Sequence, residues 1–222
     1  MAESGLYKPY QYDDAYACDP GVLRFLSRVL SHLPPQSQVL DVGCGTGKPV
    51  AETLAAAGHF ITGIDDVDAM VELSQKRIPN GMFQLSDMRE YVHPKGKQLD
   101  AVLMVRSLFR LGREEIEETV RKYGSQLHVG GLVCIATMAA DDFNLDNILS
   151  GYDHDGLCAR EVRKRFMGNH VTSALLTRAG WKQLLQENGF NIVDQKMEVF
   201  GPPDQIDSDA LPYYYIIAKK VQ

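Results

Sequence analysis

The apolar positions between residues 20 and 35 have the period of an amphipathic helix. One face carries residues spaced three or four apart, namely Val22, Phe25, Leu26, Val29, Leu30 and Leu33. Such spacing is typical of a helix that packs one side on a core. Asp19 can cap the N-terminus of this helix, Pro20 suits its first position, and Pro34 cannot continue it. We therefore predict a helix over residues 22–33.

Short apolar runs alternate with segments of helical spacing along much of the remaining chain. The runs predict strands over residues 38–42, 60–65, 82–85, 101–105 and 132–137. The segments between several of them predict helices over residues 50–57, 69–78 and 113–127. A helix over 178–188 and two strands over 191–200 and 213–220 follow a polar region with no clean period. Strands that alternate with helices are typical of a parallel sheet covered on both faces.

These elements predict an α/β fold class, a Rossmann-like doubly wound, mostly parallel seven-stranded sheet with helices on both faces and an antiparallel C-terminal strand pair. The length of 222 residues suits one domain of ordinary size. We divide this single domain, residues 1–222, into four parts. They are an N-terminal arm and helix (1–35), a core (36–137), an inserted cover (138–176), and a C-terminal helix and strand pair (177–222).

The charge and composition exclude several classes of partner. A formal net charge of −6 and a sequence pI of about 5.5 lack the cationic excess that nucleic-acid binding usually needs. No apolar run approaches the ~20 residues of a membrane span, and the first residues lack a signal-peptide core. The four cysteines have no zinc or CxxC spacing. We expect a cytoplasmic protein with reduced thiols, with no nucleic-acid or membrane partner; the oligomeric state stays open.

The stretch VLDVGCGTGKPV, residues 39–50, ends an apolar strand in an acid and then places glycines at every second position. Asp41, Gly43, Gly45 and Gly47 thus lie in a strand-to-helix turn, at the edge of the sheet where ligands bind. A glycine lets the backbone adopt unusual conformations and approach a ligand closely. The sequence therefore predicts a ligand that lies on this loop.

The spacing of the glycines separates the ligand classes that use such a turn. A phosphate-binding P-loop needs a glycine where the chain has Val42 and a hydroxyl where it has Pro49. The dinucleotide fingerprint needs its last glycine where the chain has Lys48. A nucleoside triphosphate is therefore disfavoured, and an NAD-linked oxidoreductase is kept as an alternative.

Four stretches in order resemble the motifs of the class I S-adenosylmethionine-dependent methyltransferases. They are VLDVGCGTG (39–47), ITGIDDVDAM (61–70), FQLSDMREY (83–91) and LDAVLMV (99–105). The resemblance implies that residues 36–137 bind S-adenosylmethionine, that the inserted segment covers the substrate, and that the methyl group goes to an O, N or S atom of a small molecule. Residues 151–168 look similar to segments of small methyltransferases in fungal secondary metabolism.

The resemblance also implies roles for individual residues. The glycines would line the methionine part of the cofactor, with Asp41 beneath them near its ammonium group. Asp65 would hold the ribose hydroxyls, a role that an acid at a strand end about twenty residues past the glycines also indicates independently. Asp87 and the Met88 backbone would meet the adenine edge, and Met70 would pack near the ring. The full predicted cofactor set is Asp41, Gly43, Cys44, Gly45, Gly47, Asp65, Asp66, Met70, Asp87, Met88 and Val105. The plainer alternative is that Asp41 and Asp65 only cap turns.

The catalytic and acceptor residues are harder to read, because a sulfonium methyl group is already electrophilic and positioning is the main catalytic device. His154 is the best candidate for a general base, and Arg106 is a further catalytic candidate. Arg106 and Arg110 could bind a carboxylate of the acceptor, or be surface residues beside an acidic helix.

For acceptor binding we select Tyr12 and Tyr16, from a cluster that includes Tyr7 and Tyr10, and also His170. No metal is expected, because no carboxylate follows the fourth predicted strand. Since no base can be assigned firmly, a cofactor-binding protein without turnover is a further alternative.

Overall fold

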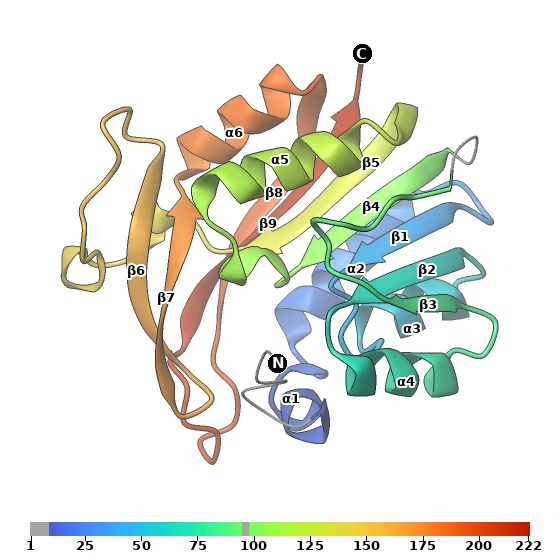
Figure 1. The fold of residues 1–222 in the computed structure, drawn as a ribbon, viewed down its shortest axis with the longest axis horizontal. Helices are drawn as coiled ribbons and strands as arrows, with labels where there is room; N and C mark the ends of the chain where they lie inside the picture. The colour runs from blue at the N-terminus through green and yellow to red at the C-terminus, as the bar shows by residue number, and fades with distance from the viewer. Residues whose placement is uncertain (1–8, 95–97) are drawn as a thin grey trace.

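A seven-stranded sheet runs through the molecule in the order β3-β2-β1-β4-β5-β9-β8 (Figure 1). The computed structural model describes residues 9–94 and 98–222. The strands are β1 Gln38–Val42, β2 Phe60–Asp65, β3 Met82–Leu85, β4 Leu99–Val105, β5 Leu127–Thr137, β8 Phe190–Phe200 and β9 Leu211–Lys220. Neighbours among β1 to β5 pair in parallel, whereas β9 is antiparallel to both β5 and β8. The predicted fold class, including the C-terminal strand pair, is confirmed.

Helices cover the two faces of this sheet. In Figure 1, α5 (Arg113–Gly124) and α6 (Arg178–Glu187) lie in front of the sheet. The other face is covered by α2 (Pro20–His32) and α3 (Val50–Ala56). The remaining helices are α1 Pro9–Tyr16, α4 Asp68–Arg77, and the short 3-10 helices η1 Leu108–Arg110, η2 Ala140–Asp142 and η3 Leu145–Asn147. The sheet is therefore the middle layer of three.

The strands are apolar almost throughout because successive side chains enter two different cores. Leu40 and Val42 pack in the cluster under α5 and α6, whereas Val39 packs with α2 and α3. The same alternation separates Val102 from Leu103 in β4. Full burial of one such side chain stabilises the fold by about 1.5–3 kcal/mol. Both layers of helices are therefore needed to bury these strands.

Helix α2 begins at Pro20, two residues before the predicted range, with the Asp19 cap that the sequence predicts. The Asp19 carboxylate accepts a hydrogen bond of 2.7 Å from the backbone N–H of Gly21, and Pro20 occupies the first turn. The helix ends at His32, one residue before the predicted end. Asp19 is completely buried, which is unusual for a capping residue. Its carboxylate also forms an ion pair with Arg106, at the end of β4.

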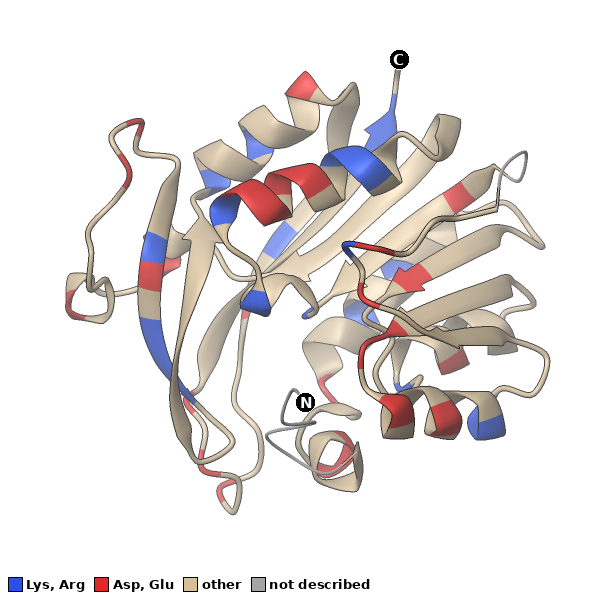
Figure 2. Ribbon diagram, in the orientation of Figure 1, with Lys and Arg blue, Asp and Glu red and all other residues tan. Residues whose placement is uncertain are grey.

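The inserted cover contains regular structure that the sequence analysis missed. Strands β6 (Cys158–Phe166) and β7 (Asn169–Leu176) form a separate antiparallel hairpin. Figure 2 shows the charged residues of β6 as bands along the strand. Val162 and Lys164 point inward while their neighbours are exposed, but a register shift between Ala159 and Val162 interrupts the alternation. A strand with charged outer positions and a bulge has no clear apolar period.

Candidate functional site

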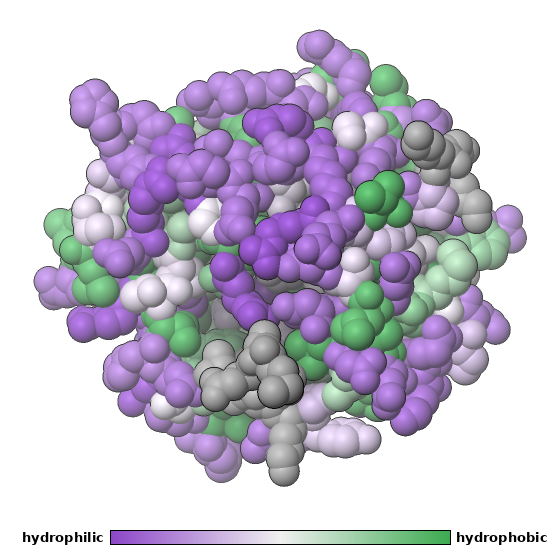
Figure 3. Space-filling model, viewed as in Figure 1, coloured by the Kyte–Doolittle hydropathy of each residue, from purple (hydrophilic) through white to green (hydrophobic). Residues whose placement is uncertain are grey.

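The candidate site lies between β1 and β4, where the chain order of the sheet reverses. In open α/β sheets this is the position at which ligands bind. The turn after β1 and the turn after β4 touch here, since a Cβ placed on Gly43 would lie 2.3 Å from the Cβ of Ser107. Figure 3 shows the molecular surface hollowed near the centre of this face. The glycine loop therefore lies against the segment that follows β4.

The three glycines of the loop all have backbone angles that side chains disfavour. The φ angles are +76° at Gly43, +52° at Gly45 and +81° at Gly47. A Cβ on Gly47 would lie 3.2 Å from Ser74 and from Ile78, whereas a Cβ on Gly45 would meet nothing within 4 Å. The backbone at Gly45 therefore borders open space, as a ligand-binding loop requires.

Hydrogen bonds hold this loop in one conformation. The N–H groups of Gly43 and Cys44 both donate to the carbonyl of Ile64, at 2.8 and 2.9 Å. The N–H of Gly45 donates to Asp65 Oδ2 at 2.8 Å, and its carbonyl accepts from Ser74 Oγ at 2.7 Å. The loop is thus tied to the end of β2 and to α4 without help from a ligand.

Asp65 and Asp66 have different surroundings although they are neighbours. Asp65 accepts from the N–H groups of Gly45 and Val67, and burial raises its pKa. An ionised carboxylate can accept about four hydrogen bonds, so Asp65 retains acceptor capacity. Asp66 is exposed and forms an ion pair of 3.1 Å with Arg110, which is itself exposed. Asp65 therefore takes part in the hydrogen bonds that hold the glycine loop, whereas Asp66 lies at the exposed edge of the site.

Asp41 is a buried acid beneath the glycine loop. Its Oδ2 atom is buried and has no hydrogen-bond partner among the described residues. Burial, and the nearby charge of Asp65, raise the pKa of Asp41 to about 7. Ionisation of such a group is unfavourable unless a cation approaches it. Cys44 is also buried, and burial raises the pKa of its thiol well above the ordinary value, which keeps the thiol neutral.

The residues predicted to surround the adenine ring lie after β3 and in α4. The Asp87 carboxylate accepts from the backbone N–H of Arg89 at 2.8 Å and from its guanidinium. The Met88 carbonyl accepts from the Tyr123 hydroxyl at 2.6 Å. Met70 is buried in α4. These contacts are all within the protein, so the adenine role of the three residues stays a prediction.

Val105 and Arg106 end β4 and begin the adjoining segment. Val105 is half-buried and pairs with Ala136 of β5. The Arg106 side chain is only 5% exposed and forms an ion pair with Asp19. Its guanidinium carbon lies 3.7 Å from the ring centroid of Tyr213. Arg106 therefore has a buried acidic partner of its own, and it is not a surface residue.

The predicted aromatic residues of the N-terminal arm pack on the inserted hairpin. The ring centroid of Tyr16 lies 5.1 Å from that of Tyr12 and 5.5 Å from that of Phe166 in β6. Tyr16 is buried and Tyr12 is half-buried. Tyr7 lies outside the described residues. Helix α1 and the hairpin thus meet beside the carboxyl ends of the parallel strands (Figure 1).

The same helix is also attached to the glycine loop. The Asp13 carboxylate accepts from the Thr46 hydroxyl and from the Arg77 guanidinium. Arg77 donates in addition to the carbonyl of Thr46 at 3.0 Å. These three residues connect α1, the loop and α4. The N-terminal arm is therefore built into the wall of the site.

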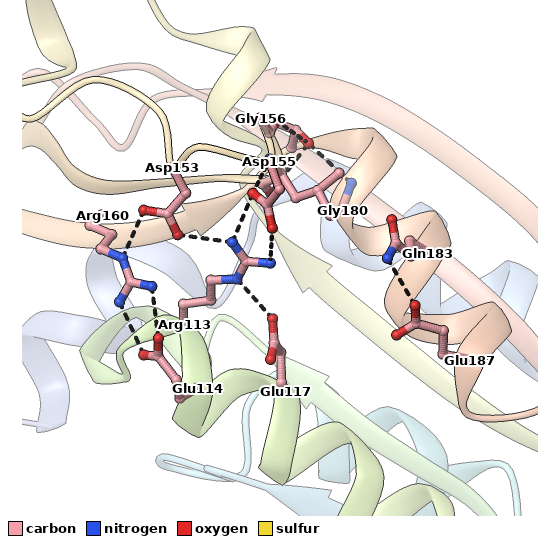
Figure 4. Close-up of polar contacts among 12 residues, drawn as sticks. Arg113, Glu114, Glu117, Asp153, Asp155, Gly156, Arg160, Gly180, Gln183 and Glu187 are labelled. Carbon is pink, nitrogen blue, oxygen red and sulfur yellow. Dashed lines mark hydrogen bonds and ion pairs between the residues drawn. The ribbon is translucent and has the colours of Figure 1, made fainter.

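The two candidate histidines lie on the inserted cover, and both are exposed. His154 stands between Asp153 and Asp155, which bind the Arg113 guanidinium at the start of α5 (Figure 4). His170 lies in β7 and borders a surface hollow with Asn147, Arg163, Lys164, Arg165 and Asp209. The structure places the histidines in different parts of the cover, and a role as base stays a prediction.

Sequence reasoning missed a buried lysine on the inner face of the hairpin. Lys164 is 4% exposed, and its ammonium donates to Ser173 Oγ at 2.5 Å. Its Nζ lies 5.5 Å from the ring centroid of Phe109, which belongs to η1. Burial lowers the pKa of Lys164 to about 8. The only signal in the sequence is the alternation of Val162, Lys164 and Phe166.

Within residues 9–94 and 98–222, no group of three or more His, Cys, Asp or Glu side chains could hold a metal ion. Asp141 and Asp142, which follow β5, instead bind Arg178. No helix in the described part of the chain is long and apolar enough to cross a membrane.

Comparisons with known proteins match the core of this fold. A family model for a methyltransferase domain matches residues 39–131. The 27-O-demethylrifamycin SV methyltransferase of Amycolatopsis mediterranei is 26% identical over 167 residues, or 72% of this chain and 58% of that protein. The trans-aconitate 2-methyltransferase of Delftia acidovorans is 34% identical over 100 residues, or 44% of this chain and 36% of that protein. The chain spans little more than half the length of the first curated relatives that it matches.

A solved structure extends the likeness to nearly the whole chain. The magnesium protoporphyrin IX methyltransferase of Synechocystis, solved with bound S-adenosylhomocysteine, superposes with a TM-score of 0.65 at 16% identity. The alignment covers 98% of this chain and 89% of that one. At such low identity the likeness shows the fold alone, and the inserted hairpin and C-terminal strands fall within it.

Proposed function

Because the chain belongs to the class I S-adenosylmethionine-dependent methyltransferases, we propose that it transfers the cofactor's methyl group to an O, N or S atom of a small-molecule acceptor. The observation that carries the proposal is the glycine loop, whose backbone borders open space at Gly45 beside the buried acid Asp41 and the half-buried acid Asp65. Asp41, with one buried oxygen lacking a partner, suits a cationic ammonium group. The predicted cofactor is therefore compatible with the residues present.

Individual residues have distinct tasks in this proposal. Asp41 would hold the ammonium group of the cofactor, and Asp65 would use its remaining acceptor capacity for the ribose hydroxyls. Gly43, Gly45 and Gly47 would let the cofactor lie close to the backbone. S-adenosylmethionine supplies an electrophilic methyl group when bound, so no metal or activated nucleophile of the protein is required.

The catalytic contribution of the chain is then mainly positional. Holding the acceptor atom in line with the bond that breaks can lower the barrier by about 7–11 kcal/mol. The stacked rings of Tyr16 and Phe166 would help to keep water away from the acceptor. An acceptor hydroxyl or ammonium must also lose a proton, and His154 is our candidate to receive it.

The choice of a small molecule is supported by the relatives, whose names specify a rifamycin and trans-aconitate as their substrates. The acidic net charge of −6 offers no general attraction to polyanions. A place in secondary metabolism is our proposal on the same grounds. The methylated atom is left open between O, N and S.

Calorimetric titration with S-adenosylhomocysteine tests the cofactor site. We expect micromolar binding to the wild type, and at least about tenfold weaker binding to Gly45→Val, whose side chain would occupy the open space beside the loop. Gly58→Val is the matched control, because Gly58 also has a positive φ, +86°, and nothing within 4 Å of its Cβ. Absence of binding to the wild type, or equal losses in the two variants, would contradict the proposal.

Turnover is tested separately, with methyl-labelled S-adenosylmethionine and a fractionated metabolite extract. A methylated product in one fraction supports methyltransferase activity. Loss of that labelled product with Asp65→Ala assigns the activity to the candidate site. Tight cofactor binding without any labelled product would favour a binding protein. An NADH fluorescence titration with saturable binding would favour the oxidoreductase instead.

A further inference from the structure

Lys164 is a buried cation without an anionic partner among the described residues. Its ammonium has three N–H donors, and Ser173 Oγ accepts one of them at 2.5 Å. No carboxylate within residues 9–94 and 98–222 forms an ion pair with it. The Phe109 ring, 5.5 Å away, supplies a weaker cation–π contact. Burying a charge in this way is costly, so an anion that reached the ammonium would stabilise its charged form.

The position of Lys164 connects it to the candidate site. Ser173 Oγ in turn donates a hydrogen bond to the carbonyl of Phe109 at 2.8 Å. Phe109 lies in η1, directly after β4, and its neighbour Arg110 reaches Asp66 on the other side. The short segment 107–110 therefore touches the glycine loop at one end and the hairpin at the other.

We propose that the Lys164 ammonium binds a carboxylate group of the small-molecule acceptor, an assignment that rests on the proposed function. The cation projects from the hairpin onto the segment that follows β4, so an acceptor held there lies between the hairpin and the glycine loop. Two N–H donors of Lys164 remain for the oxygens of the carboxylate. Phe109 lies alongside to pack on the apolar part of the ligand.

Alternative roles for this lysine fit the structure less well. With its pKa lowered to about 8 by burial, Lys164 is mostly protonated at pH 7, which suits anion binding better than proton abstraction. Arg106 was the sequence-based candidate for a carboxylate ligand, but its guanidinium is already paired with buried Asp19. Arg110 is exposed at the rim and paired with Asp66. Lys164 is thus the cation best placed to bind an anion within the described site.

Nuclear magnetic resonance of protein with ¹³C- and ¹⁵N-labelled lysine tests the proposal. The probe is benzoate, an aromatic carboxylate, and benzamide is its neutral control of the same shape. We expect benzoate to shift the Lys164 side-chain resonance in a saturable manner. Benzamide should bind at least tenfold more weakly, a difference of about 1.4 kcal/mol. Equal affinities, or no shift of the Lys164 resonance, would overturn the proposal.

Substitutions of Lys164 distinguish an effect of its charge on benzoate binding from an effect on the folding of the hairpin. Lys164→Met should weaken benzoate binding tenfold or more, and Lys164→Arg should retain most of it. Lys182→Met is the matched control, because it removes the same kind of cation from an exposed position on α6. It should change the affinity less than twofold. Unchanged benzoate affinity in Lys164→Met would refute the proposal, and the wild-type titration decides the matter if that variant does not fold.

The titrations are run with and without S-adenosylhomocysteine. Benzoate binding at Lys164 in a protein that fails to bind S-adenosylhomocysteine would contradict the proposed function and leave the anion site intact. Cofactor binding without benzoate binding would contradict the anion site and leave the proposed function intact. The two proposals can therefore fail independently.

Discussion

The buried ion pair between Arg106 and Asp19 joins the end of β4 to the start of α2, 87 residues earlier in the chain. The two side chains are 5% and 0% exposed. We expect Arg106→Met, which removes the charge and keeps much of the volume, to lower the free energy of unfolding by about 3–5 kcal/mol. Asp19 would keep its hydrogen bond from Gly21, but its charge would be buried without a cation.

This loss is large compared with the stability of a typical domain, about 5–15 kcal/mol. Urea unfolding followed by circular dichroism measures it as a shift of the midpoint at constant slope. The double variant Arg106→Met with Asp19→Asn should recover most of the loss, because no charge remains buried and asparagine is a good helix N-cap. The pair would then have a coupling energy of several kcal/mol.

Two results would refute the reasoning. A loss below about 1 kcal/mol in Arg106→Met would show that the pair behaves like an exposed salt bridge. A double variant that loses the sum of the single losses would show that the two residues act independently. If Arg106 instead binds the acceptor, the variant should keep its stability and lose only affinity for the acceptor.

Three further predictions follow from the site and the cover. Asp41 has its pKa raised to about 7, so its neutral form stabilises the ligand-free protein at low pH, and this contribution is lost as pH rises from about 4 through 7. In urea unfolding, the free energy of unfolding of Asp41→Asn relative to the wild type should rise over that window, by at most about 1.4 kcal/mol per pH unit. A difference that stays constant with pH would contradict this. Gly43→Ala should lose about 1–3 kcal/mol more than Gly58→Ala, since both have positive φ but only Gly43 meets Ser107; equal midpoints in urea would exclude the clash. Arg113→Ala, which frees Asp153 and Asp155 (Figure 4), should speed hydrogen exchange of residues 151–157 at least tenfold, and the exposed Arg121→Ala should not.

The candidate site divides into a part that the sequence predicted and a part that it did not. The glycine loop was visible because its spacing is local, and each glycine does adopt a positive φ. Asp65 was visible because it ends a strand, and it does bind the loop through Gly45. Lys164 was missed because burial of a charged residue contradicts the usual pattern. Its surroundings come from η1 and β7, which are distant in the sequence.

The sequence by itself determined the layered α/β fold, because strands buried on both faces and helices with one apolar face are periodic patterns within short windows. It also determined the cap of α2 at Asp19. Only the tertiary structure decided that Asp19 pairs with Arg106, that the inserted cover forms a hairpin, and that Lys164 faces η1. The physical reason is that partners of buried charges are selected by packing between distant segments, which no local period encodes.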